Sequence, residues 1–141
     1  MASGRFNMVL GIAALMVSVF VGFALGFSLE KYYQSGYGQI PLWRYLTKAG
    51  HTHGMPFGLI NLLFGLLIAR SAGSDRLKKT GAVLTALSLL VPVGTSVRGL
   101  TEGAPFAMGI VMTGALAFLA ACVTMILCIR STPATTKGQA G

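Results

Sequence analysis

Charged residues are absent from four long stretches of this 141-residue chain, and no other feature constrains its fold as strongly. The stretches cover residues 6–29, 49–69, 80–97 and 103–129. Each is close to the roughly 20 residues that an α-helix needs to cross the hydrocarbon core of a bilayer. Charged residues make up 10% of the chain, well below the roughly 25% of a soluble domain. The sequence therefore predicts an all-α integral membrane four-helix bundle, with residues 1–141 as a single transmembrane domain.

The distribution of basic residues predicts the orientation of this bundle. Seven lysines and arginines fall on the side of the two termini and the middle loop, against four on the other side. The first group is Arg5, Arg70, Arg76, Lys78, Lys79, Arg130 and Lys137, and the second is Lys31, Arg44, Lys48 and Arg98. Basic loops favour the cytoplasm, so we expect both termini there, in a bacterial-type cell membrane. The net charge of +8 then reflects topology and contact with membrane lipids, and it gives no support to nucleic-acid binding.

The first stretch predicts a retained helix that packs closely against a neighbour. Its apolar run is longer than the 7–15 residues of a signal peptide. Gly22 and Gly26 are four residues apart, and Gly11, Ala14 and Ser18 extend the stripe of small side chains. Such stripes let two helices approach in lipid. The partner helix can belong to the same chain or to a second subunit.

Both histidines of the chain, His51 and His53, lie at the start of the second stretch. Imidazole is the commonest metal ligand in proteins, and an ionisable side chain at membrane depth is a functional-site hypothesis by default. Pro56 allows two structures, because proline fits the first turn of a helix and disturbs the ladder further in. If the helix begins near Pro56, both histidines lie in a loop. If it begins near Leu46, they point about 200° apart and cannot chelate one ion.

In the helical case, one face of the second span becomes the expected pocket lining. That face carries His53, Phe57, Asn61 and Phe64. An amide in hydrocarbon needs partners, so Asn61 either orients a ligand or anchors another helix. An adjacent strip of glycines leaves room for a close helix or for the flat face of a macrocycle. These glycines are Gly54, Gly58 and Gly65.

Two segments on the less basic side could complete such a site. The 30–48 connection holds all four tyrosines and predicts either an interfacial segment or a lid. Near the outer end of the third stretch, Pro92 and Gly94 predict a kink or an early end of the helix, which would expose carbonyl groups at the level of the histidines. Arg98, just beyond, either extends to the interface or pairs with a carboxylate such as a haem propionate.

The histidine segment and Asn61 together resemble the styrene oxide isomerase group of small four-span membrane proteins. That resemblance implies haem b held by an axial histidine at the subunit interface of a trimer. By position His53 is the implied axial ligand, with His51 as its support or replacement, and Asn61 is the implied catalytic residue. Ferric haem would then convert a small apolar epoxide to a carbonyl compound. The third span has no tyrosine to match the family's second catalytic group, so the resemblance implies haem binding more directly than isomerisation.

Two other classes of function remain open on the residues alone. His51, His53 and Met55 form a mixed nitrogen and sulfur set that suits copper, provided the segment is not helical. Alternatively, the protein is a non-catalytic subunit of a membrane complex, or an electron-transfer or sensing protein with both faces of a haem occupied. The spans hold no set of histidines and carboxylates for a zinc hydrolase.

Overall fold

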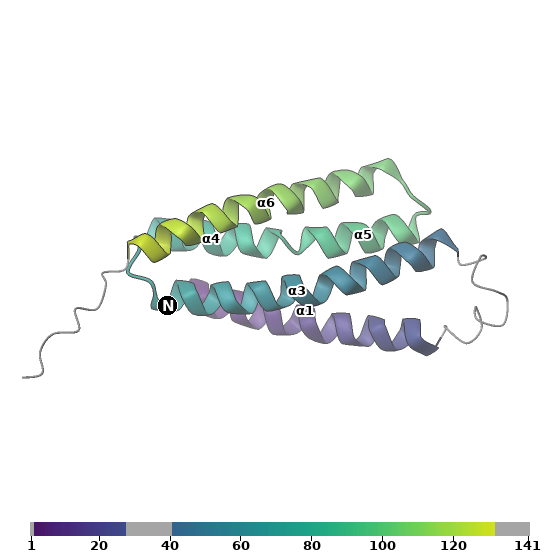
Figure 1. The fold of residues 1–141 in the computed structure, drawn as a ribbon, viewed down its shortest axis with the longest axis horizontal. Coiled ribbons are helices and arrows are strands. Elements are labelled where there is room, and N and C mark those ends of the chain that lie inside the picture. The colour runs from purple at the N-terminus through teal and green to yellow at the C-terminus, as the bar shows by residue number, and fades with distance from the viewer. Residues whose placement is uncertain (1, 28–40, 132–141) are drawn as a thin grey trace, which may run out of the picture.

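The computed structural model describes residues 2–27 and 41–131, which form a bundle of α-helices (Figure 1). The helices are α1 (Ala2–Phe27), α3 (Leu42–Arg70), α4 (Asp75–Leu87), α5 (Leu90–Leu100) and α6 (Pro105–Arg130). Since α4 and α5 together make one span, four spans result, all long and apolar enough to cross a membrane. The predicted all-α membrane bundle is confirmed. Most of the tyrosine-rich connection that we interpreted as a lid or interfacial segment lies in 28–40, outside the described residues.

The four spans are arranged with α3 and the α4–α5 span in the centre. Helix α1 packs along α3, and α6 packs along α4 and α5. The start of α1 and the end of α6 lie at the same end of the bundle (Figure 1). We call this the basic end, because Arg5, Arg70, Arg76, Lys78, Lys79 and Arg130 gather there. The opposite end, which holds the α5–α6 turn at 101–104, is the far end.

Small residues bring α1 and α3 into direct backbone contact. A Cβ atom on Gly11 would lie 2.6 Å from the Gly58 carbonyl oxygen, and one on Gly4 would lie 2.6 Å from that of Gly65. The α1 stripe therefore packs within the chain as far as Gly22, whereas a Cβ atom on Gly26 would meet nothing within 4 Å. The glycine strip on α3 is accordingly filled by a close helix rather than left open for a macrocycle.

The third span breaks where Pro92 requires it. Pro92 has no N–H to donate to the carbonyl group of Ser88, four residues earlier, and its ring crowds that turn. The Ser88 carbonyl oxygen instead accepts from Val91 N at 3.1 Å, and α4 ends at Leu87. The predicted interruption of the helix is thus present, but it lies near the middle of the span and not near its outer end. A tight turn with positive φ at Glu102 (51°) and Gly103 (97°) then leads into α6.

The second span is longer than the uncharged stretch predicted. Helix α3 begins at Leu42 and continues through Pro56, so the helical alternative for the histidine segment holds. Arg44 and Lys48 precede the uncharged stretch and nevertheless lie within the helix. The guanidinium Nη2 of Arg44 donates to the Leu25 carbonyl oxygen at 2.8 Å, which holds the charged group near the end of α1.

Candidate functional site

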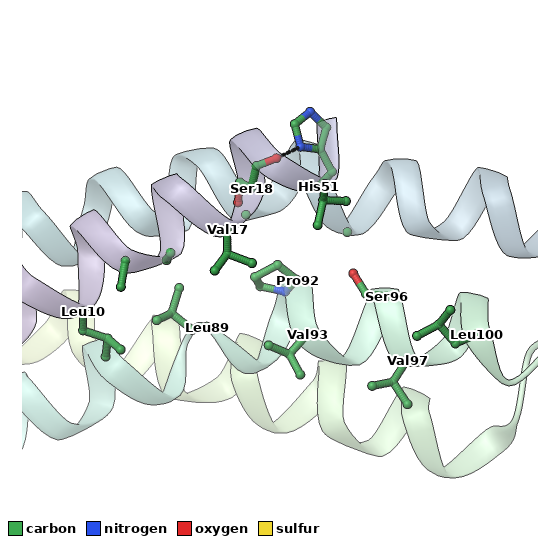
Figure 2. Close-up of a pocket in the computed structure, with 15 residues that line it drawn as sticks. Leu10, Val17, Ser18, His51, Leu89, Pro92, Val93, Ser96, Val97 and Leu100 are labelled. Carbon is green, nitrogen blue, oxygen red and sulfur yellow. Dashed lines mark hydrogen bonds between the residues drawn. The ribbon is translucent and has the colours of Figure 1, made fainter. Parts of the chain in front are cut away.

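The two histidines of α3 project in different directions. His51 is half-buried against α1, where its Nδ1 lies 2.6 Å from the Ser18 carbonyl oxygen. A Cβ atom on Gly22 would lie 2.6 Å from the Cε1 atom of this ring, so glycine is required opposite the imidazole. Because a carbonyl oxygen can only accept, Nδ1 carries the hydrogen. The ring lies over α1 and points away from α5 (Figure 2).

His53 is exposed on the surface of the bundle. Its Nδ1 donates to the Ala49 carbonyl oxygen at 2.7 Å, one turn earlier in the same helix. This bond places the lone pair on Nε2, which has no hydrogen-bond partner among the described residues. At 1.5 Å per residue, His53 lies roughly 25 Å along α3 from Arg70. It therefore sits close to the far edge of a hydrocarbon core of about 30 Å.

One ion cannot take both imidazoles of the same chain. Residues two apart on a helix point about 200° from each other, as the separate partners of His51 and His53 show. Copper binding by these two side chains and Met55 together needs an unwound segment, whereas α3 is helical there. In the part of the chain that the structure describes, no three side chains among His, Cys, Asp and Glu cluster as metal ligands.

Phenylalanines occupy the face of α3 that leads from His53 toward the basic end. Phe57, one turn along, makes an edge-to-face contact with Phe118 of α6, with ring centroids 5.3 Å apart at 71°. This pair joins α3 to α6. Phe64, two turns further, packs against the buried cluster of Ile68, Ala82 and Met125. Phe57 thus lies beside His53, while Phe64 belongs to the core.

Asn61 lies in a buried amide network that links three helices. It is 0% exposed, accepts at Oδ1 from Asn7 Nδ2 at 3.2 Å, and donates to the Thr85 carbonyl oxygen at 3.0 Å. Asn7, also 0% exposed, donates in addition to the Ala82 carbonyl oxygen at 2.9 Å. These bonds give Asn61 the helix-anchoring role that the sequence left open beside ligand binding. Asn7 escaped the sequence analysis, although its depth in α1 matches that of Asn61 in the antiparallel α3.

Arg98 lies near the end of α5 and is only half-buried. Its Nη1 approaches the Met108 sulfur at 3.8 Å, a weak contact for a guanidinium. Its buried Nε has no hydrogen-bond partner among the described residues. The guanidinium group of Arg98 therefore has no strong partner among the described residues, as pairing with a carboxylate through its outer nitrogens would need.

A cavity of about 450 Å³ lies on the other side of α3, between α1 and α5 (Figure 2). From α3 it is lined by Gly50, His51 and Gly54. The pocket face expected from the sequence does not line it, because His53 and Phe57 point elsewhere and Asn61 is buried in the amide network. The cavity arises from the divergence of α1 and α5, a tertiary feature that no sequence motif marks.

Comparison of the chain with protein-family models, curated proteins and solved structures gives no match. The assignment of a function therefore rests on the described geometry and on the resemblance stated above.

Proposed function

We propose that this protein binds haem b at the far end of the bundle, with Nε2 of His53 as the axial ligand. The observation that carries the proposal is the bond from His53 Nδ1 to the Ala49 carbonyl oxygen at 2.7 Å. A histidine that ligates a metal almost always donates its other ring N–H to such a group, which fixes both tautomer and orientation. The free Nε2 then faces the membrane, where a polar atom without a partner is costly.

The surroundings of His53 suit a porphyrin at the edge of the bilayer. Phe57 offers an aromatic surface one turn deeper, and the T-shaped pair with Phe118 holds it in place. The propionates of a haem at this depth would lie in the interface, where the Nη1 atom of Arg98 makes only a weak contact with the Met108 sulfur. The donors and the apolar face both fit the group.

The opposite face of this haem would be left to a second molecule. His51 of the same chain cannot reach it, because its ring lies over α1 and is held by Ser18. A second copy of the chain would cover the exposed His53 surface, and the family resemblance implies a trimer. Because no second histidine of the same chain could reach the haem, the described residues favour chemistry on a substrate over electron transfer with two histidine ligands.

Isomerisation of an apolar epoxide is the reaction we propose for this site. Ferric haem supplies a Lewis acid for the epoxide oxygen and needs no net electron transfer. The chain's own residues would provide an apolar approach from the bilayer and exclude water, with Phe57 as the nearest described aromatic side chain. Asn61, the catalytic residue that the resemblance implies, would act on the substrate only after leaving its bonds to Asn7 and Thr85.

The orientation follows from the same charge asymmetry. Because the basic end gathers Arg5, Arg70, Arg76, Lys78, Lys79 and Arg130, we propose that it faces the cytoplasm of a bacterial-type cell. His53 and the proposed haem would then lie near the outer surface of the membrane.

Two measurements on the purified protein test this function. A Soret absorption band supports haem, bound copper without that band supports the copper alternative, and neither supports a non-catalytic membrane subunit. Incubation of the haem-loaded protein with an aryl epoxide should yield the isomeric carbonyl compound. Haem present without product, under both oxidising and reducing conditions, would contradict the isomerase and leave electron transfer or sensing.

A further inference from the structure

The cavity between α1 and α5 is lined almost entirely by apolar atoms. At the end toward the basic end of the bundle lie Leu10 and Leu89 (Figure 2). At the far end lie Ser96, Val97 and Leu100. The part along α5 from Leu89 to Leu100 is roughly 16 Å long at 1.5 Å per residue. No charged side chain lines the cavity, so its occupant has an uncharged body.

Two serine hydroxyls in this cavity lack the bond that other helix hydroxyls make. Most threonines along the described helices donate to the carbonyl group of the preceding turn, with Thr80 as an exception. Those that do so are Thr47, Thr52, Thr85, Thr95, Thr101, Thr113 and Thr124. Within the described residues, neither Ser18 nor Ser96 has a hydrogen bond from its hydroxyl, although Ser18 is only 6% exposed. Both are spare donors in a membrane-embedded wall.

The hydroxyls lie at a defined depth. A Cβ atom on Gly54 would meet Ser18 Oγ, and one on Gly50 would meet Ser96 Oγ. Ser18 of α1 and Ser96 of α5 therefore pack against adjacent turns of α3. Measured from Arg70, these turns are roughly 24 Å and 30 Å along the helix. With a hydrocarbon core of about 30 Å, the donors fall at its far edge and just inside it. Ester carbonyl groups of membrane lipids lie at this boundary.

We propose that the cavity is a binding site for a glycerolipid of the leaflet at the far end. One acyl chain fills the cavity down to Leu10 and Leu89. The two ester carbonyl oxygens of the lipid accept from Ser18 and Ser96, one each. The volume of about 450 Å³ falls within the roughly 300–1,000 Å³ of pockets that hold small apolar molecules.

The charge at the mouth of the cavity selects the headgroup. Lys48 is exposed two residues before Gly50, which lines the cavity. At this end of the bundle as a whole, Arg44, Lys48 and Arg98 oppose one described carboxylate, that of Glu102. The surplus of positive charge complements an anionic lipid phosphate. This site is separate from the proposed haem site, which lies on the face of α3 toward α6.

Binding of ester-linked and ether-linked phosphatidylglycerol, with the same headgroup and chain length, tests the proposal by native mass spectrometry. The full chain should bind the ester lipid about fivefold more tightly than the ether lipid for each hydrogen bond to the carbonyl group. Ser18→Ala with Ser96→Ala should reduce the affinity for the ester lipid to that for the ether lipid. Alanine is smaller than serine, so this double variant introduces no clash.

Two further variants, and identification of the molecule that copurifies with the protein, complete the test. Thr95→Ala, beside Ser96 but with its hydroxyl bound to the Val91 carbonyl oxygen at 2.8 Å, should keep the ester preference. Ala14→Phe, which fills the cavity, should weaken binding of both lipids. Equal binding of ester and ether lipids by the unaltered chain, or a preference that survives the double serine variant, would overturn the proposal. So would recovery of a quinone, instead of a glycerolipid, as the molecule that copurifies with the protein.

Discussion

His51 on α3 and Ser18 on α1 are joined by a 2.6 Å contact between the imidazole Nδ1 and a backbone carbonyl oxygen. His51 is seven residues before Gly58, which is seven before Gly65, and these three positions face Ser18, Gly11 and Gly4. The imidazole thus occupies a position where the rest of this helix pair uses glycine. It fits because α1 offers Gly22 beneath the ring, so its structural role is to lock α1 onto α3 near the far end.

The first prediction concerns the space beneath this ring. Gly22→Val should displace the His51 imidazole and destabilise the bundle by about 1–3 kcal/mol, the usual effect of overpacking. Unfolding in mixed detergent micelles, followed by circular dichroism, measures the change. Gly26→Val is the matched control on the same helix, because a Cβ atom there meets nothing within 4 Å. Equal stability of the two variants would contradict the described packing.

A second prediction tests the amide network. Asn61→Leu should cost about 1–3 kcal/mol, because it leaves the Thr85 carbonyl oxygen and the Asn7 amide with fewer partners. Asn7→Leu should cost a similar amount. The double variant should be less destabilised than the sum of the two, since no unpaired amide remains. Strictly additive free energies of unfolding would show that the two side chains are not coupled.

The third prediction concerns orientation. A tag fused at the carboxyl terminus should be protected from external protease in intact cells and cut after the membrane is opened, because the basic end is expected to face the cytoplasm. A tag in the α5–α6 turn, at the far end, provides the opposite control. Accessibility of the carboxyl-terminal tag from outside alone would reverse the proposed topology.

The four spans could be predicted from sequence because charge in hydrocarbon is costly enough to limit where a helix crosses. The start of α3 could not be predicted in this way. The guanidinium group of Arg44 donates to the Leu25 carbonyl oxygen, and this contact allows a charged residue inside the helix. Helix periodicity alone placed His51 and His53 on different faces once α3 was known to be helical.

The neighbours of these residues required the tertiary structure. The pairing of Asn7 with Asn61 depends on the register of α1 against α3. The stripes of small residues allow the two helices to pack closely, but they do not specify which residues lie opposite each other. Ser18 stood out only as a small side chain. Its role in the cavity wall, like that of Ser96, follows from the divergence of α1 and α5 around them.

The central claim is that His53 ligates haem, and a paired haem titration tests it most directly. The unaltered chain, His53→Ala and His51→Ala are each reconstituted with haem b, and the Soret band is followed as haem is added. We predict saturation at about one haem per chain for the unaltered protein, loss of binding in His53→Ala with its helices still inserted, and retained binding in His51→Ala. Full haem occupancy in the double variant His51→Ala and His53→Ala would contradict the account.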